Sequence, residues 1–354
     1  MKTLSGLLVI GLALSLSPAA VAQPAPAQAT IETPSIGAVA ETEAVASLDD
    51  AADDPAVWRD RARPSRSLIV ATDKKAGLNV YDLTGKLVAS TPAGRVNNVD
   101  LRADVSINGR SGVLVAASDR NDPANGHVAL YELGTKPAAL TLLARAPAGP
   151  GEAYGFCLWR RAADRALFAF LVFKNGEVRQ FALDASGAAP KLTLVRSFAL
   201  ATQSEGCVAD DRTGILYVAE EDVGVWRVPA APESPQKPEL FAAADGARLV
   251  ADVEGLAIMP KGRVGGLLLV SSQGDSAYTA YDLADGRFVK RFRIAPSGAF
   301  GATSETDGIE FAPGRFGKPF GDGIFIAQDG DNSPKAQNFK LVSGSALRRL
   351  LGAK

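Results

Sequence analysis

One short pattern repeats six times along this sequence of 354 residues, and it constrains the fold more than any other feature. Each copy has an apolar run that closes on polar residues: LIVATDK from Leu68, LVAASDR from Leu114, FAFLVFK from Phe168, LYVAEED from Leu216, LLVSSQG from Leu268 and IFIAQDG from Ile324. A second series precedes these runs, at Asp54, Asn98, Tyr154, Glu205, Glu254 and Asp307, and a third follows them. Three short strands that recur about every 50 residues are typical of β-propeller blades.

We therefore predict an all-β, six-bladed β-propeller. The last copy provides only three strands, beginning near Asp307, Ile324 and Asn338, whereas a propeller blade has four. Because an open sheet edge exposes unpaired backbone groups, we expect residues 38–47 to add an N-terminal strand to the last blade and close the ring. The tail from Ser345, SALRRLLGAK, is expected to form a short surface helix.

The first residues indicate export. Lys2 is followed by an apolar run from Leu7 to Leu16 and then by Ala20-Val21-Ala22, after which a signal peptidase would cut. We predict a signal peptide over residues 1–22, a Pro/Ala linker over 23–35 and one propeller domain over 36–354. The formal net charge of −1 gives no general attraction to nucleic acid or membranes. We expect a monomer in the periplasm or outside the cell that binds neither nucleic acid nor membranes.

Export gives the two cysteines a possible role. Cys157 and Cys207 follow Tyr154 and Glu205 closely, which places them on the first strands of neighbouring blades. Two interpretations stay open, a disulfide and a pair of small buried hydrophobic residues. Neither cysteine begins a Cys-x5-Arg phosphatase loop.

Polar residues at equivalent repeat positions should meet at one mouth of the central channel. One side of that mouth would carry Lys74, Arg120 and Lys174. The other side would carry Asp54, Glu205, Glu221, Glu254, Gln273 and Asp307, with Asp53, Glu220 and Asp252 adjacent in sequence. So many carboxylates repel one another unless they are protonated or bind cations, and hard oxygen ligands favour calcium over zinc or copper. Calcium ions beside lysine and arginine side chains would suit the binding of a phosphate ester. The alternative is that these residues are ordinary charged side chains of turns and of the propeller rim.

Other phosphate-handling motifs lack their key residues. The single histidine, His127, is not part of an Arg-His-Gly motif, and no Gly-x4-Gly-Lys-Ser/Thr loop occurs. The segment from Asp329 begins like an EF-hand, but Pro334 and Lys340 occupy its sixth and twelfth positions.

Motifs spread over about residues 40 to 342 resemble the β-propeller phytases. They include DDPAVW from Asp53, TDKKAGLNVYDLTGK from Thr72, NNVDLR from Asn97, EGCVADD from Glu205, YVAEEDVGVW from Tyr217, DVEGL from Asp252, AQDGDN from Ala327 and QNFKLV from Gln337. The resemblance implies a 3-phytase, a phosphoric monoester hydrolase with several bound Ca²⁺ ions. Such an enzyme releases inorganic phosphate from calcium-complexed phytate (myo-inositol hexakisphosphate) and other inositol phosphates by direct attack of a calcium-bound water.

Carried over by position, the resemblance implies calcium ligands at Glu41, Asp53, Asp54, Glu205, Glu220, Glu221, Asp252, Glu254, Gln273 and Asp307. It implies phosphate contacts at Lys74, Lys75, Arg120, Tyr154 and Lys174, and a catalytic set of Lys74, Arg120, Tyr154, Lys174 and Glu205.

The resemblance also implies a peripheral calcium site at Asp329, Asp331 and Asn332. Gly301 stands where the family commonly has an aspartate and Asp331 where it has a glutamate, so we expect this site to bind calcium more weakly. Two other function classes stay open, a calcium-dependent propeller lactonase and a non-catalytic secreted binding propeller.

Overall fold

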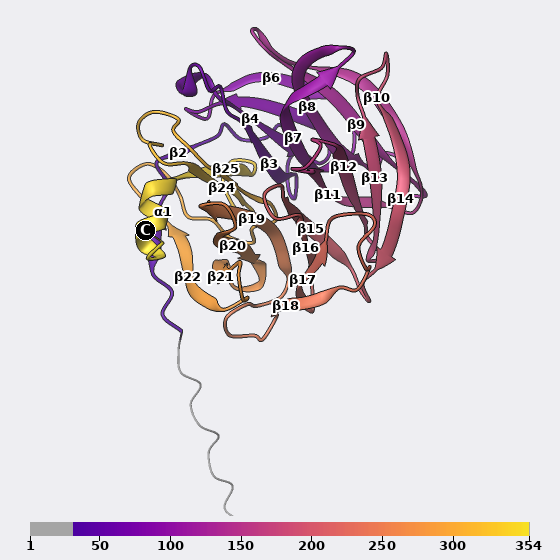
Figure 1. Ribbon diagram of the computed structural model, residues 1–354. Coiled ribbons are helices and arrows are strands. Elements are labelled where there is room, and N and C mark those ends of the chain that lie inside the picture. The colour runs from indigo at the N-terminus through magenta and orange to yellow at the C-terminus, as the bar shows by residue number, and fades with distance from the viewer. Residues whose placement is uncertain (1–30, 354) are drawn as a thin grey trace, which may run out of the picture. The chain divides into compact units, whose positions relative to one another are not determined.

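Six sheets surround a central axis in the computed structural model, which describes residues 31–353 (Figure 1). The predicted all-β, six-bladed propeller is therefore confirmed. The predicted signal peptide and the first part of the predicted linker lie outside the described residues.

Each blade begins with its inner strand and runs outward along the chain. Blade 1 contains β3 (Ala52–Trp58), β4 (Leu68–Asp73), β5 (Gly77–Asp82) and β6 (Leu87–Pro92). Blade 2 contains β7 (Val96–Ile107), β8 (Arg110–Asp119), β9 (Asn125–Thr135) and β10 (Ala138–Pro150). Blade 3 contains β11 (Ala153–Arg160), β12 (Leu167–Phe173), β13 (Glu177–Asp184) and β14 (Lys191–Ala199). Blade 4 contains β15 (Ser204–Asp210), β16 (Ile215–Glu220), β17 (Gly224–Pro229) and β18 (Glu239–Ala243).

The last two blades each recruit a strand from the N-terminal part of the chain. Blade 5 contains β19 (Val253–Lys261), β20 (Gly265–Ser272), β21 (Ala277–Asp282) and β22 (Phe288–Ala295), with β1 (Ser35–Gly37) parallel to β22. Blade 6 contains β23 (Ile309–Ala312), β24 (Ile324–Asp329) and β25 (Asn338–Ser343), with β2 (Ala40–Glu41) antiparallel to β25. The predicted ring closure by residues 38–47 is therefore confirmed. The tail begins with helix α1 (Gly344–Leu350), whose Leu347 is buried, and two short 3-10 helices cover Pro64–Arg66 and Gln273–Asp275.

The hydrophobic core lies between the blades rather than in one central mass. The described residues form six apolar clusters, each between two neighbouring blades. Strands β4, β12 and β24 are buried at every position because their sheets are covered on both faces, which explains their continuous apolar runs. This arrangement leaves the ends of the inner strands free to carry polar side chains around the channel.

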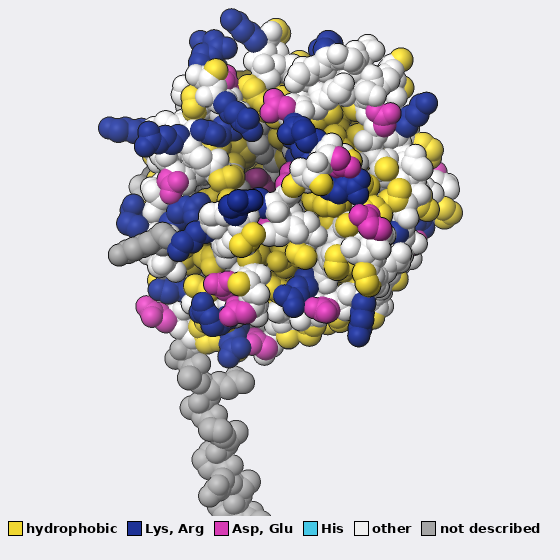
Figure 2. Space-filling view, viewed as in Figure 1, with side chains coloured by type: hydrophobic (Ala, Val, Ile, Leu, Met, Phe, Trp, Pro, Cys, Tyr) yellow, Lys and Arg dark blue, Asp and Glu magenta, His cyan; other side chains and the backbone are white. Residues whose placement is uncertain are grey.

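A disulfide joins Cys157 on β11 to Cys207 on β15, with 5.8 Å between their Cα atoms. It therefore links the inner strands of blades 3 and 4. The structure thus shows the disulfide rather than two separate buried cysteines. No helix among residues 31–353 is long and apolar enough to cross a membrane. In the view of Figure 2, lysine and arginine side chains are interspersed with aspartate and glutamate, in keeping with the small net charge.

Candidate active site

The inner strands all begin at the same end of the channel, and a cavity of about 780 Å³ opens there. Its lining comes from the first residues of inner strands, from the loops that precede them and from loops that follow the second strands of the blades. Among the described residues, nine carboxylates but only two lysines line it: Asp49, Asp50, Glu205, Glu221, Asp252, Glu254, Glu305, Asp307 and Asp331, with Lys74 and Lys335. The cavity therefore has a strong excess of acidic groups, which disfavours the entry of an anion unless these groups bind cations or protons.

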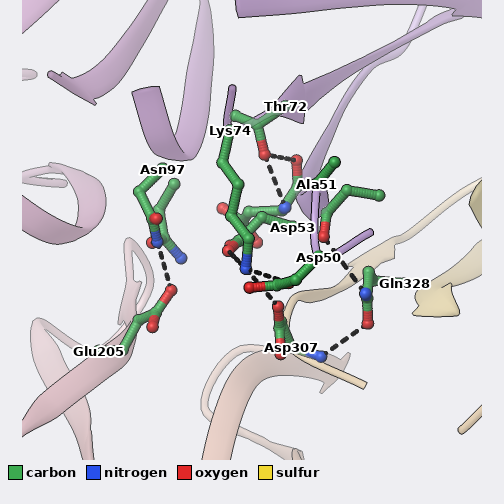
Figure 3. A network of polar contacts seen from close by, with 12 residues as sticks. Asp50, Ala51, Asp53, Thr72, Lys74, Asn97, Glu205, Asp307 and Gln328 are labelled. Carbon is green, nitrogen blue, oxygen red and sulfur yellow. Dashed lines mark hydrogen bonds and ion pairs between the residues drawn. The ribbon is translucent and has the colours of Figure 1, made fainter. Parts of the chain in front are cut away.

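Lys74 lies at the centre of one group of these carboxylates, as Figure 3 shows. Its Nζ lies 2.6 Å from Asp50 Oδ1, 3.2 Å from Asp53 Oδ2 and 3.0 Å from Asp307 Oδ2. Burial favours the neutral amine, but the charges of Asp53 and Asp307 outweigh it and raise the pKa of Lys74. Lys74 therefore remains an ammonium ion that joins blade 1 to blade 6.

Burial and the charge of Asp53 raise the pKa of Asp307 to about 7, although Lys74 opposes this shift. Gln273 Nε2 donates to Asp307 Oδ1 over 2.6 Å, and Gln328 Oε1 accepts from the backbone N–H of Asp307 over 2.8 Å. Gln273 thus holds the carboxylate of Asp307, and Gln328 holds its backbone, at the mouth of the channel. The raised pKa of Asp307 indicates that the charge of Lys74 does not fully balance the carboxylates around it.

A second group of carboxylates faces Lys74 from blades 4 and 5. Oxygen atoms of Glu205, Glu221 and Glu254 all lie within 4.8 Å of one another. Burial and nearby carboxylates raise the pKa values of Glu205 and Glu254 well above their ordinary values. Two amide side chains orient this group. Asn97 Nδ2 donates to Glu205 Oε1 over 2.5 Å (Figure 3), and Gln203 Nε2 donates to both oxygens of Glu221 over 2.8 Å.

These residues fit one or more calcium ions. Buried Asp53 Oδ1 has no hydrogen-bond partner among the described residues, so a carboxylate oxygen at the mouth is left uncompensated. The donors are all oxygens, the ligand type that calcium prefers. The raised pKa values of Glu205, Glu254 and Asp307 also fit a cation site, since buried carboxylates this close together must bind either protons or cations. Of the predicted ligands, the structure brings together Asp53, Glu205, Glu221, Asp252, Glu254, Gln273 and Asp307.

Predicted phosphate contacts flank this group on the side of blades 2 and 3. The Tyr154 ring lies between Arg120, whose Cζ is 5.5 Å from the ring centroid, and Lys174, whose Nζ is 5.2 Å away. Buried Arg120 Nε has no partner among residues 31–353, and its NH1 group lies 3.6 Å from Glu152. Burial and the charge of Glu205 raise the pKa of Tyr154, so its phenol stays neutral. Lys75 lies apart from this group, and its Nζ donates to the backbone oxygen of Leu48 over 2.7 Å.

Besides Glu41, which contacts Lys340 in blade 6, two predicted ligands point away from the mouth. Asp54 Oδ2 accepts from the backbone N–H of Val99 over 3.0 Å, and Asp54 lines a smaller cavity between the inner strands of the six blades. Glu220 is fully buried inside blade 4, where its oxygens accept from Thr202 and from Trp226 Nε1, each over 2.7 Å. The structure therefore separates these two carboxylates from the group that contains Lys74.

The residues of the predicted peripheral site lie in blade 6, around the buried Lys340. Its Nζ lies 2.7 Å from Glu41 Oε2, 3.1 Å from Asp329 Oδ2 and 3.1 Å from Asn332 Oδ1. Asp331 is turned away and accepts from the backbone N–H of Ser333 over 3.1 Å.

Sequence reasoning missed several residues that orient the site. Asp50 binds Lys74, Asn97 binds Glu205, and Gln203 binds Glu221. Asp50 and Gln203 lie just before an inner strand and Asn97 is the second residue of one, so a search of the residues around the starts of these strands could have identified them.

Comparison with known proteins adds an independent finding. The model of a protein family described as Phytase matches residues 3–354 of this chain. A 3-phytase of Bacillus subtilis (strain 168) is 39% identical over 326 residues, which cover 88% of this chain and 84% of that protein.

Proposed function

The chain belongs to the phytase family, and from this premise we propose that it hydrolyses phytate in a calcium-dependent reaction that releases inorganic phosphate. Inositol phosphates are the substrate class that the family implies. The role assigned to calcium rests on the chemistry of the cavity.

The excess of carboxylates at the mouth of the channel is the observation that carries this proposal. A phosphate monoester bears a charge of roughly −1.5 to −2 near neutral pH, so phytate would be repelled by the cavity as it stands. The same carboxylates are the donors that calcium prefers. Cation binding is therefore a precondition for binding this substrate.

The residues divide into two roles. Asp53, Glu205, Glu221, Glu254 and Asp307 would hold calcium, with Asp252 and Gln273 beside them. When bound, calcium supplies positive charge for phosphate oxygens and lowers the pKa of water.

Arg120 and Lys174 approach from the other side, where they present cationic groups to a phosphate next to the Tyr154 ring. Lys74 connects the two roles, since it keeps its proton and lies against Asp53 and Asp307. We assign it to a phosphate oxygen once a metal ion balances those carboxylates.

We also propose that the protein acts outside the cytoplasm. The Cys157–Cys207 bridge supports this, because disulfides persist in oxidising compartments.

Release of inorganic phosphate from phytate, with and without calcium, tests the proposal. We expect phosphate release in millimolar calcium and its loss in excess EGTA. Glu205→Gln should lower both phosphate release and the calcium affinity measured by calorimetry. The matched control Glu239→Gln changes an exposed glutamate of β18 and should affect neither. Full phosphate release in EGTA would refute the calcium requirement, and no release in calcium would favour the lactonase or binding-protein alternatives.

A further inference from the structure

Blade 6 contains a lysine whose side chain is completely buried and whose ammonium group is surrounded by oxygen atoms. Lys340 Nζ lies 2.7 Å from Glu41 Oε2, 3.1 Å from Asp329 Oδ2, 3.1 Å from Asn332 Oδ1 and 3.0 Å from Asn338 Oδ1. The four partners come from β2, the end of β24, the following loop and the start of β25. Two carboxylates and two amide oxygens from separate segments thus converge on one positive charge.

This environment has the composition of a calcium site, but its centre is already taken. Carboxylate and amide oxygens are typical calcium ligands, and a buried lysine is stable only when its charge is balanced in this way. Lys74 faces three carboxylates with further acidic groups nearby, whereas Lys340 faces two carboxylates and two neutral amide oxygens, so its charge leaves little negative charge to attract a metal ion to the same place. The residues therefore do not fit a calcium ion at the peripheral position that the phytase resemblance implies.

Gly301 supports the same conclusion. A Cβ atom built at Gly301 would lie 3.7 Å from Lys340 Nζ, so this position faces the ammonium group. The family commonly has an aspartate at the corresponding position, and this chain has no side chain there. Asp331, which stands in place of the family's glutamate, is exposed and turned toward Ser333. Fewer carboxylates face the site, and the lysine satisfies those that remain.

We propose that the Lys340 ammonium takes the place of a metal ion in blade 6, so that closure of the ring is independent of calcium. Glu41 lies directly opposite Lys340 in the pairing of β2 with β25. The ion pair thereby holds the closing strand in register. Calcium, which the proposed function requires at the channel mouth, then has no part in the closure of this blade.

Glu41→Gln provides the first test, because it removes one carboxylate and preserves the size of the side chain. We expect the melting temperature to fall by several degrees, by the same amount in millimolar calcium and in excess EGTA. The matched control Glu43→Gln changes an exposed glutamate of the same segment and should leave the melting temperature unchanged. A loss confined to calcium would show that Glu41 binds a metal ion and would overturn the proposal.

Lys340→Met provides the second test, because it removes the charge and keeps an unbranched apolar side chain of similar length. Glu41 and Asp329 would then lack their cation, and we expect a stability loss that millimolar calcium partly restores, together with one additional calcium ion bound per chain by calorimetry. Lys191→Met, at an exposed position of β14, serves as the control. The proposal would be refuted by a folded Lys340→Met protein that calcium stabilises no more than it stabilises the wild type and that binds no additional calcium ion. If this variant does not fold, the Glu41→Gln comparison decides.

Gly301→Asp gives a third readout that needs no loss of stability. A carboxylate beside the ammonium group should raise the melting temperature equally with calcium and with EGTA. Stabilisation only in calcium would mean that a metal ion occupies the site.

Discussion

The metal-free protein should lose stability as the pH rises from about 5 to about 7.5, and Asp307 is the residue for which this effect can be worked out. Burial and the charge of Asp53 raise its pKa from 3.8 to about 7, although Lys74 Nζ lies 3.0 Å from its Oδ2 atom. The unfolded chain releases this proton near its ordinary pKa, whereas the folded chain keeps it to about neutral pH. Between these values the folded state binds more protons, so stability decreases as the pH increases.

The size of the effect follows from the two pKa values. Linkage gives a loss of about 2.5 kcal/mol for Asp307 alone between about pH 5 and about pH 7.5. Glu205 and Glu254, whose pKa values are also raised by burial, contribute with the same sign. Asp119 and Asp164, whose pKa values are lowered, titrate below this interval and do not affect it.

Urea unfolding in excess EGTA at the two pH values measures this loss. Asp307→Asn cannot ionise, so the pH dependence of its stability should be smaller by about 2.5 kcal/mol. The control Asp285→Asn changes an exposed aspartate and should keep the wild-type dependence. Equal or greater wild-type stability at the higher pH, or an unchanged dependence in Asp307→Asn, would show that the assigned pKa shift is wrong.

The remaining predictions concern phosphate binding, the interior of blade 4 and the disulfide. Arg120→Ala and Lys174→Ala should each lower kcat/KM for phytate at least tenfold, about 1.4 kcal/mol of transition-state binding, with little change in melting temperature; wild-type kinetics in both would remove them from the site. Glu220→Gln should destabilise the protein by about 1 to 3 kcal/mol without changing kcat/KM, because the carboxylate serves buried donors rather than calcium; a change in calcium affinity would contradict this. Reduction of the Cys157–Cys207 bridge, which closes a loop of 50 residues, should cost up to about 4 kcal/mol of unfolding free energy, and unchanged urea midpoints with and without reductant would contradict that estimate.

The sequence signal was strongest where strands are covered on both faces. The apolar runs at β4, β12 and β24 predicted the second strand of their blades because both faces of these strands are buried. Outer strands such as β6 carry no such run, since every second side chain faces solvent, and they were not predicted individually. Ser35 begins β1, which pairs in parallel with β22, although the Pro/Ala-rich composition of residues 23–35 indicates a linker that ends there.

Within the site, the repeat predicted which blade carries each carboxylate but not which way the side chain points. Asp53 contacts Lys74, whereas the adjacent Asp54 contacts Val99 on the next blade. Glu221 faces the cavity, whereas the adjacent Glu220 lies inside blade 4. Asp53 and Asp54 are successive residues of β3, whose side chains point in opposite directions, and Glu221 follows the last residue of β16, so neighbouring acidic residues do not all reach one mouth. The resemblance alone does not distinguish the members of these pairs.

The closing strand also determines the order in which the chain can finish folding. Glu41 and Lys340 are 299 residues apart, so their pairing is among the most nonlocal contacts in the molecule. The entropic penalty of such a long loop grows only slowly with its length, but contacts of this kind form late because the intervening chain must first be ordered. Blades 1 to 4 are contiguous in sequence and can form as local units, whereas blade 6 has an unpaired edge until β2 arrives. A chain that lacks β2 would leave the edge of β25 exposed to other chains, so we expect the complete ring to resist edge-to-edge aggregation better than the ring without this strand.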